Sequence, residues 1–360
     1  MTRHWSINGR FLSQPLTGVQ RHAQEIVLAL DDLVAKKDPS VAGLSFDVLV
    51  PQNPLRTITL RSFPQVTVAG MGGHAWEQTA LPRRINTGLL SLGNTGPLVI
   101  RRQIVCIHDA NTRLQPDSYS RAFRWLYRGL HPALGRTAAR IVTVSDFSSA
   151  QLVRLGIVDQ KRITVIPNGY EHALRWPAQH TPVTRAHAGP STIVLLGSLA
   201  PHKNIELILN LAPSLAAHGL KIAVVGSKDS KIFAAFDGSQ HGDTVHWLGR
   251  LEDTALAALL RDSLCLAFPS LTEGFGLPPL EAMALGCPVV SSNAASLVEV
   301  CADAALYADP LDPAAWLARI LELHASQQLQ TTLVIKGRAR AEAFSWSKSA
   351  RLYAGLMQSI

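Results

Sequence analysis

Short apolar runs alternate with helical patterns along almost the whole chain, and this alternation limits the possible fold more than any other feature. In the first half, the runs predict strands at Phe46–Val50, Gln65–Val68, Gln103–Ile107, Arg140–Val144 and Ile163–Ile166. In the second half, they predict strands at Thr192–Gly197, Lys221–Val225, Val245–Leu248, Leu264–Phe268 and Pro288–Ser291. Continuous apolar strands separated by helices are typical of parallel sheets with helices on both faces. The sequence therefore predicts an α/β protein with two doubly wound sheets.

The length of the chain predicts two domains, because 360 residues are more than one hydrophobic core usually supports. Residues 175–190 are rich in proline and polar side chains and lack a clear period, which predicts a linker. We expect an N-terminal doubly wound domain over residues 1–176 and a C-terminal one over residues 191–344. The helical pattern of residues 345–360 is compatible with packing back on the first domain. Ligands of such sheets bind beyond the carboxyl ends of the strands, so we expect the domains to face a cleft.

The composition is that of a folded protein, with 47% hydrophobic and 17% charged residues. None of the four cysteines forms a CxxC pair, which favours reduced core thiols over disulfides or a zinc site. The first residues lack a basic segment followed by an apolar run, and no apolar stretch reaches membrane-spanning length. We therefore expect a cytoplasmic protein with no secretory signal.

The charge is concentrated in the first half of the chain. Residues 1–180 hold 21 Lys and Arg against 11 Asp and Glu, net +10, whereas residues 181–360 hold 13 against 15, net −2. Three of the arginines, Arg121, Arg124 and Arg128, recur at helical spacing and share a face. The excess fits nucleic acid, an anionic membrane surface, a phosphorylated substrate, or a face that is merely solvated. No nucleic-acid motif is present and aromatic residues make up only 6%, so we expect no nucleic-acid partner.

One loop in the second half combines carboxylates with glycines, in the sequence PSLTEGFGLPPLE from Pro269 to Glu281. It follows an apolar strand and precedes a helical pattern. Glu273 and Glu281 stand eight positions apart. The glycines between them allow close backbone approach, and the helix start offers free N–H groups to anions. Carboxylates accept hydrogen bonds from hydroxyls. A plain strand-to-helix turn would explain each residue singly, but the combination predicts a site for a polyhydroxylated, phosphorylated ligand.

A second loop, GSLAPHKN at Gly197–Asn204, directly follows a predicted strand. Lys203 is expected at a helix start, where it would meet a diphosphate; the alternative is an exposed lysine on a capped helix. A third loop, LTGVQR, precedes a helix for which Thr17 is a plausible N-cap, and Gly18 gives it a flexible point near a ligand.

A fourth candidate is His108, at the carboxyl end of the strand QIVCI. It would bind a sugar hydroxyl or a phosphate, or be structural, and Asp109 would orient it or cap the next helix. Two serines are predicted to be structural: Ser145 as an N-cap, and Ser296 in a capping box with Glu299.

Several motifs of other enzyme classes are missing. There is no Asp-x-Asp pair near a strand end, so a carboxylate-held metal is not indicated. The sequence also lacks GxGxxG at a helix start, GxxxxGK[ST] and GxSxG. These absences weaken the nicotinamide-enzyme, nucleotide triphosphatase and α/β-hydrolase interpretations.

The combined motifs resemble one family. EGFGLPPLE resembles the E-x7-E signature of retaining glycosyltransferase family 4, whose GT-B fold has two Rossmann-like domains facing a cleft. GSLAPHKN resembles the family's phosphate-binding loop, and ITVIPNGY resembles the segment before its interdomain linker. IVTVSDFSSAQL and VCIHDAN resemble motifs of its N-terminal domain. The likeness runs in order through most of the chain, and it is specific for fold and reaction class rather than for the sugar.

The resemblance implies site residues. Catalytic roles at the donor sugar fall to His108, which faces the acceptor side, and to Glu273. Glu281 would bind the donor ribose. The remaining donor-binding residues would be Gly18, Ser198, Lys203, Gly274, Phe275, Gly276 and Leu277. Many family members have an arginine where this chain has Ser198, so Lys203, His202 or an N-domain arginine would supply that charge.

The activity implied is transfer of a sugar from a nucleotide diphosphate to a hydroxyl with retention, without a metal or another cofactor. The PHKN loop is similar to PRKN-type loops of bacterial mannosyltransferases that build O-antigen or exopolysaccharide, which favours GDP-mannose. UDP-glucose, UDP-galactose and UDP-N-acetylglucosamine stay open. The basic first half motivates a polyprenyl-diphosphate-linked saccharide acceptor and a peripheral position on the cytoplasmic membrane. The competing interpretations are an epimerase or phosphorylase on the same fold, a non-catalytic nucleotide-sugar-binding protein and, last, a nucleic-acid binder.

Overall fold

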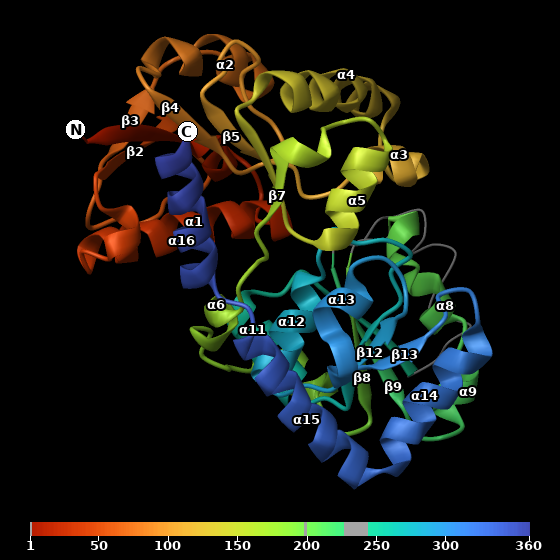
Figure 1. The fold of residues 1–360 in the computed structure, drawn as a ribbon. Coiled ribbons are helices and arrows are strands. Elements are labelled where there is room, and N and C mark those ends of the chain that lie inside the picture. The colour runs from red at the N-terminus through yellow and green to blue at the C-terminus, as the bar shows by residue number, and fades with distance from the viewer. Residues whose placement is uncertain (1, 198–199, 227–243) are drawn as a thin grey trace. The chain divides into compact units, whose positions relative to one another are not determined.

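The computed structural model describes residues 2–197, 200–226 and 244–360, and these divide into two compact units. The first unit consists of residues 1–169 and 345–360, and the second of residues 170–344. Figure 1 shows both as sheets covered by helices. Each unit is described by itself below.

The first unit is built on a seven-stranded parallel sheet with the order β3-β2-β1-β4-β5-β6-β7. The strands are β1 Arg3–Asn8, β2 Leu44–Pro51, β3 Gln65–Val68, β4 Gly88–Ser91, β5 Gln103–Cys106, β6 Arg140–Thr143 and β7 Ile163–Val165. All five strands predicted for this half are present. The sequence missed β1, whose apolar residues are interrupted by polar ones, and β4, which has only four residues.

Helices cover this sheet. They are α1 Gly18–Ala35, α2 Gly73–Thr79, α3 Asn111–Leu114, α4 Arg121–Thr137, α5 Asp146–Arg154 and α16 Trp346–Ser359. Short 3-10 turns lie at η1 Gly9–Ser13, η2 Pro39–Val41, η3 Leu81–Arg84, η4 Pro116–Ser118 and η5 Gln160–Arg162. The C-terminal helix α16 packs on α1 (Figure 1). Its Tyr353 and Met357 are fully buried, and the Ser349 hydroxyl donates to the carbonyl oxygen of Pro167 at 2.6 Å. Apolar burial therefore fixes the end of the chain to the first unit.

The second unit contains a six-stranded parallel sheet with the order β10-β9-β8-β11-β12-β13. The strands are β8 Thr192–Leu196, β9 Lys221–Val225, β10 Val245–Gly249, β11 Cys265–Phe268, β12 Val289–Ser292 and β13 Leu306–Ala308. The five predicted strands are again present. The short edge strand β13 was missed, because three residues carry too little periodicity to be recognised.

The described helices of this unit are α6 Glu171–Leu174, α7 Pro182–His187, α8 Ile205–Leu209, α9 Ala212–Ala216, α11 Asp253–Arg261, α12 Leu277–Leu285, α13 Leu297–Cys301, α14 Pro313–Ala325 and α15 Gln327–Glu342. Two 3-10 turns are η6 Pro201–Lys203 and η8 Ala302–Ala304. Nearly every residue of α12 is buried, and the helix packs against α11, α13 and α15. Gly337 of α15 lets the two helices approach, since a Cβ there would lie 3.2 Å from Met283 Cγ. The helix that follows the paired-glutamate loop is therefore held in the core.

The segment predicted as a linker is structured. Residues 182–187 form α7, which opens with a reciprocal hydrogen-bonded box between Thr181 and Thr184. The helix packs on α11, and the N–H of Gln179 donates to Thr254 at 3.2 Å. The division between units instead falls between Gly169 and Tyr170. Side-chain capping thus orders a stretch whose proline content had suggested a loop.

Two expectations on composition have structural counterparts. All four cysteines are buried and unpaired, as predicted for core thiols. No helix among the described residues combines the length and the apolar character that crossing a bilayer requires.

Candidate active site

The second sheet reverses its strand order between β8 and β11. The chain builds β8, β9 and β10 outward in one direction, then returns to lay β11 beside β8 and continues to β13. In sheets of this topology the loops on the two sides of the reversal diverge, and ligands bind there, beyond the carboxyl ends of the strands. Lys203 follows β8 and Glu273 follows β11, so the topology brings two of the predicted site residues to one place.

Lys203 and Glu273 form an ion pair, with Nζ 2.6 Å from Oε1. Their side chains keep 22% and 12% of their exposure, so the pair is partly screened from water but reachable. The ammonium also lies 5.7 Å from the centre of the Phe268 ring. Among the described residues, Glu273 is the sole hydrogen-bond acceptor of Lys203 Nζ, and an ammonium has three N–H donors. Two donors remain for an anion at this place.

Asn204, the residue after Lys203, holds this loop in place. Asn204 adopts a left-handed conformation with φ of 52°, which asparagine tolerates better than most residues. Its side-chain amide donates to the carbonyl oxygens of Pro269, at 3.2 Å, and Pro310, at 2.8 Å. One residue thus ties the loop after β8 to the loops after β11 and β13. Lys203 was predicted at a helix start, but it ends a 3-10 turn before a helix of only five residues, so its own charge matters more than a helix dipole.

Glu281 is 7% exposed on α12 and faces α6. Nε2 of His172 lies 2.8 Å from its Oε1, a hydrogen bond in which the ring donates to the carboxylate. No described residue donates to Oε2, so one carboxylate oxygen remains for a ligand hydroxyl. His172 was not singled out from the sequence, because it is 109 positions away from its partner. Such pairing fixes the carboxylate rotamer before a ligand arrives.

The loop between the glutamates offers its N–H groups differently from the prediction. Pro278 and Pro279 occupy the first turn of α12 and have no N–H, so the helix start provides fewer donors than expected. The N–H groups of Phe275, Gly276 and Leu277 have no acceptor among the described residues. Gly274, Phe275, Gly276 and Leu277 are buried, so their contribution to a ligand would come from the backbone. The donors of this site therefore lie in the last loop residues, Phe275 and Gly276, and on Leu277, the first residue of the helix.

Gly276 is required by the local geometry. Its φ is +110°, in the region that favours glycine, and a Cβ there would lie 2.8 Å from Leu297 Cδ2. The residue is the N-cap of α12. Glycine is therefore needed both for the chain turn and for the close packing of α13.

Ser296 was predicted to cap α13 in a box with Glu299, and this prediction was wrong. Ser296 has helical dihedral angles and makes no side-chain cap hydrogen bond. Its hydroxyl oxygen lies 3.0 Å from the carbonyl oxygen of Glu273 and 2.8 Å from that of Phe275. An N-cap needs an extended backbone, and Ser296 lacks one. The hydroxyl instead fixes the loop that bears Glu273.

In the first unit, His108 lies just beyond the carboxyl end of β5 and is 5% exposed. Burial lowers its pKa to about 4, so the ring is neutral at pH 7. Nε2 lies 3.0 Å from the carbonyl oxygen of Leu92, which assigns the proton to Nε2. No described residue bonds to Nδ1, which therefore keeps a lone pair able to accept a hydrogen bond from a hydroxyl. Asp109 accepts at 2.8 Å from the N–H of Asn111, the first residue of α3, although the N-cap of that helix is Ala110.

A buried polar cluster stands behind His108. His22 meets it edge-on, with ring centres 4.6 Å apart, and also bonds Asn168 at 2.7 Å and Tyr353 at 3.2 Å. His22, Cys106 and His108 have ligand atoms within 4.8 Å of one another. However, both nitrogens of His22 are engaged, and burial raises the pKa of the Cys106 thiol to about 12. The cluster fits a hydrogen-bonded support for His108 better than a metal ligand set.

A second network at the switch point of this sheet, between β1 and β4, was missed by the sequence analysis. Glu77 Oε1 accepts from Asn8 at 2.7 Å, Arg10 at 3.2 Å and Thr95 at 3.0 Å. Burial alone would raise the pKa of Glu77, but His74, Arg10 and the other donors hold it below its ordinary value. These residues come from three separate segments of the chain, so no motif marks them. Their hydrogen bonds hold a group of polar side chains in place at the carboxyl ends of β1 and β4.

The remaining predicted residues are placed as follows. Gly18 is the exposed first residue of α1, and Thr17 is its N-cap without a side-chain cap bond. His202 is buried, and burial together with the charge of Lys203 lowers its pKa. It is therefore a poor substitute for the missing arginine charge. Ser198 lies outside the described residues. Ser145 caps α5, as predicted, by accepting from Ser148 N–H at 3.0 Å.

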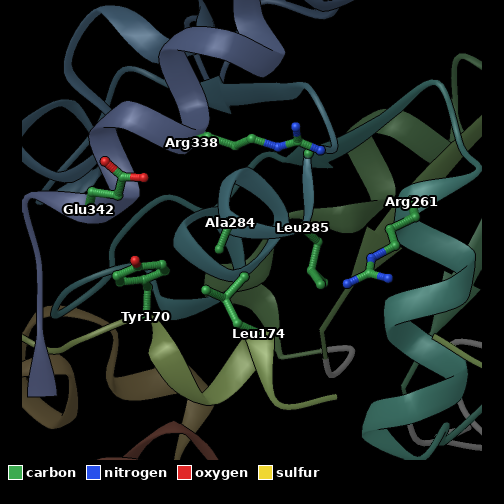
Figure 2. A pocket seen from close by; sticks show the side chains of 8 residues that line it. Tyr170, Leu174, Arg261, Ala284, Leu285, Arg338 and Glu342 are labelled. Carbon is green, nitrogen blue, oxygen red and sulfur yellow. The ribbon is translucent and has the colours of Figure 1, made fainter. Parts of the chain in front are cut away.

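A further pocket of about 480 Å³ lies at the carboxyl end of α12 (Figure 2). It is lined by Tyr170, Leu174, Arg261, Ala284, Leu285, Gly286, Arg338 and Glu342. A Cβ at Gly286, the C-cap of α12, would lie 2.6 Å from Arg338 Nη2. The Arg338 guanidinium therefore lies against the negative end of the helix dipole, which gives it a stabilising role. None of the predicted site residues lines this pocket.

Comparison with family models matches both units. Residues 179–340 match the model described as Glycosyl transferases group 1. Residues 90–169 match the Glycosyl transferase 4-like domain. The first match contains Lys203, Glu273 and Glu281, and the second contains His108.

Curated relatives include mannosyltransferases. The O-antigen chain mannosyltransferase B of Escherichia coli is 31% identical over 69% of this chain and 68% of its own length. The MMP alpha-(1->4)-mannosyltransferase of Mycolicibacterium hassiacum is 29% identical over 74% of this chain and 66% of its own length. The O-antigen chain mannosyltransferase RfbU of Salmonella typhimurium is 27% identical over 63% of this chain and 62% of its own length. The chain spans slightly less than two thirds of the last two relatives.

Solved structures share the fold over nearly the whole chain. A sucrose-phosphate synthase from Thermosynechococcus elongatus superposes with a TM-score of 0.74 at 18% identity, covering 99% of this chain and 100% of that one. WaaG, a glycosyltransferase of lipopolysaccharide biosynthesis, gives 0.70 at 16% identity and coverages of 98% and 99%. HepE of Anabaena in complex with UDP-glucose also gives 0.70 at 16% identity, covering both chains fully. With two parallel α/β sheets, these neighbours and these family matches, the chain belongs to the group 1 glycosyltransferases, with the GT-B fold and a glycosyltransferase 4-like first unit.

Proposed function

We propose that this glycosyltransferase moves mannose from GDP-mannose to a saccharide acceptor with retention of the anomeric configuration, in the synthesis of a cell-surface polysaccharide such as lipopolysaccharide. The observation that carries the proposal is the ion pair of Lys203 and Glu273 at the switch point, followed on the next helix by a carboxylate that His172 holds. The relatives that act in O-antigen synthesis support mannose as the sugar.

The positive charge and the N–H donors of the site are suited to stabilising a nucleotide diphosphate as it leaves the sugar. Negative charge develops on the leaving phosphate as its bond to the anomeric carbon breaks, and preorganised donors stabilise it. Among the described residues, two N–H donors of Lys203 and the N–H groups of Phe275, Gly276 and Leu277 have no acceptor, and the latter add neutral donors. We propose that this set replaces a metal ion. Glu281 would accept a ribose hydroxyl through Oε2.

Retention follows if attack and departure occur on one face of the sugar. In this proposal the acceptor oxygen bonds to the anomeric carbon while the phosphate leaves, through an oxocarbenium-like state, and the acceptor proton passes to a leaving phosphate oxygen. Glu273 is neutralised by Lys203, which favours an electrostatic role at the sugar over a covalent nucleophile. The neutral His108 ring would accept a hydrogen bond from a sugar hydroxyl through Nδ1, and its lowered pKa of about 4 disfavours a role as general acid near pH 7.

The acceptor is proposed to be a saccharide linked to a polyprenyl diphosphate, met by a cytoplasmic enzyme that binds the membrane peripherally. The support is the charge of residues 1–180, where 21 basic residues face 11 acidic ones, because anionic lipids and diphosphates attract such a surface.

The donor is tested by thermal unfolding with GDP, UDP, ADP and TDP and with their mannose or glucose conjugates. A ligand that binds only the folded chain raises the melting temperature. We expect GDP and GDP-mannose to give the largest shifts, and turnover with GDP-mannose to release GDP, to persist in EDTA and to give an α-linked product. Binding without turnover or hydrolysis would contradict an enzyme, and a free epimer or sugar phosphate as product would indicate an epimerase or phosphorylase.

A UDP-sugar is the second candidate donor. It is favoured by the HepE complexes with UDP and with UDP-glucose, which share the fold over the whole chain. A melting-temperature shift selective for UDP and UDP-glucose would replace GDP-mannose in the proposal and leave the roles of Lys203 and Glu281 unchanged.

A further inference from the structure

A pocket lined mainly by arginines lies on the first unit, where α3 packs on α4. Its lining residues are Thr112, Arg113, Pro116, Arg121, Arg124, Trp125 and Arg128. Its volume of about 190 Å³ corresponds to several water molecules and so admits a phosphate group. None of these residues belongs to the site described above.

The four arginines have no carboxylate partner within the part of the chain that the structure describes. Arg113 is fixed by donating to the carbonyl oxygens of Leu155, at 3.3 Å, and of Arg128, at 3.2 Å. Burial and the charge of Arg128 lower the pKa of Arg113, so these guanidinium groups repel one another. Asp117 is the acid nearest in sequence, but it is exposed and forms no ion pair there. An anion in the pocket would relieve the repulsion and could be bound by several guanidinium forks.

One large aromatic side chain lines the pocket, and two more apolar side chains that keep some exposure belong to the same helix, α4. Trp125 lines it and keeps 72% of its exposure, while Leu126 keeps 43% and Phe123 36%. Phe123 stacks on Tyr127 with ring centres 4.2 Å apart, but Tyr127 is buried, so Trp125 is the exposed aromatic side chain beside the arginines. An exposed tryptophan next to arginines is typical of a helix that lies at the headgroup level of a bilayer. A soluble phosphate would leave Trp125 exposed to water.

We propose that this α3–α4 pocket binds the phosphate of an anionic lipid headgroup, with Trp125 placed in the membrane interface. The guanidinium groups neutralise the phosphate, and the indole ring enters the boundary between headgroups and acyl chains. The inference deepens the proposed function, since the membrane-bound acceptor would be met at this surface. Its test needs neither donor nor turnover, so failure of vesicle binding and failure of the transfer reaction are distinguishable.

The test is co-sedimentation of the full chain with vesicles of phosphatidylcholine, alone or mixed with phosphatidylglycerol. We expect binding to the mixed vesicles only. The double substitution Arg121→Gln with Arg124→Gln should weaken it on the order of tenfold or more, because each basic side chain at an anionic surface contributes severalfold. The matched control is Arg83→Gln with Arg84→Gln, which removes the same charge from exposed positions of the same unit. It should change binding by no more than about twofold. Equal losses of vesicle binding in the two double variants would contradict the proposal that this pocket binds the lipid phosphate.

A second pair of variants tests the apolar anchor and keeps the proposal testable if the arginine variant unfolds. Trp125→Ser should weaken vesicle binding severalfold, and Leu55→Ser, at a side chain that keeps 67% of its exposure, should not. Titration calorimetry with inorganic phosphate and with pyrophosphate then separates the phosphate sources. Weak or undetectable binding of both supports the lipid headgroup. Arginine-dependent binding of free phosphate by a chain that ignores vesicles would overturn the membrane proposal.

Discussion

Both sheets carry polar side chains at the carboxyl ends of their strands, but the side chains are charged in the second unit and neutral around His108 in the first. At the switch point of the second sheet, charged side chains dominate: Lys203 pairs with Glu273, and Glu281 is held by His172. In the first unit, His108 beyond β5 and His22 of α1 are buried with their rings edge to face, and burial lowers the pKa of both far below the ordinary range. The first arrangement supplies charge, and the second supplies neutral hydrogen-bonding groups.

This difference fits the two halves of a transfer reaction. A leaving diphosphate needs fixed positive charge and N–H donors, which the second unit provides. A sugar hydroxyl needs neutral donors and acceptors at fixed positions, which a buried, singly protonated imidazole provides. The comparison therefore predicts that substitutions in the second unit alter donor binding through charge. For the first unit, it predicts that the free energy of unfolding depends on pH, because the buried histidines become protonated on unfolding.

The largest effect is expected from Lys203→Ala. In the proposed donor site, removing the ammonium would leave the departing phosphate without its charged donor, and loss of one such donor commonly lowers the rate about 10²- to 10³-fold. We expect kcat/KM to fall by that factor and the melting-temperature shift with GDP to shrink. Lys221→Ala, at an exposed lysine of the same unit, is the matched control and should change neither.

Glu281→Ala extends this test, because it removes the carboxylate that His172 holds. It should weaken donor binding without the loss of positive charge. Unchanged donor affinity in both the Lys203 and the Glu281 variants would contradict the assignment of this edge as the donor site.

The next effect is on the fold of the site loop. Gly276→Ala would place a Cβ 2.8 Å from Leu297 at a φ of +110°, which costs roughly 1–3 kcal/mol. Urea unfolding should show that loss, together with weaker donor binding. Gly355→Ala is the matched control, since its site on α16 is open, and alanine favours a helix by up to about 1 kcal/mol. A Gly276→Ala chain as stable as wild type would contradict the strained geometry.

Much of this edge could be anticipated from local sequence. Ten strands were predicted because continuous apolar runs mark buried parallel strands, and Lys203, Glu273 and Glu281 lie in or beside loops that follow such runs. The limits appear where partners are distant. His172 lies 109 positions from Glu281, and no pattern marks such a pair.

Other errors came from competing local rules. Ser296 with Glu299 has the spacing of a capping box, yet tertiary contacts hold Ser296 in helical geometry and direct its hydroxyl to the Glu273 loop. Pro278 and Pro279 indicated a helix start correctly, but the same residues remove two N–H groups that an anion site would use. The role of His108 was open from sequence, because its neutral state depends on burial that only the fold determines.

The pH dependence of stability tests the first unit. Burial lowers the folded-state pKa of His108 and of His131 to about 4, below the value of about 6.5 expected in the unfolded chain. Between these values the unfolded chain binds more protons, so stability is fully present above about pH 6.5 and falls as the pH drops toward 4. From about pH 7.5 to about pH 5.5, each ring should cost about 1 kcal/mol in urea unfolding. His108→Gln should remove one ring's share, about 1 kcal/mol, from this dependence and leave that of His131, while the exposed His218→Gln should leave it unchanged.

The smallest effect separates two serines that look alike in sequence. Ser145 caps α5, whereas the Ser296 hydroxyl bonds the carbonyl groups of Glu273 and Phe275. Loss of either hydroxyl should cost about 1 kcal/mol of unfolding free energy. Only Ser296→Ala should also raise the KM for the donor, by a few-fold, because it loosens the loop that positions Glu273. Equal KM values in the two variants would mean that the loop keeps its geometry without the hydroxyl, and that the charges of the second unit, rather than this tether, set donor binding.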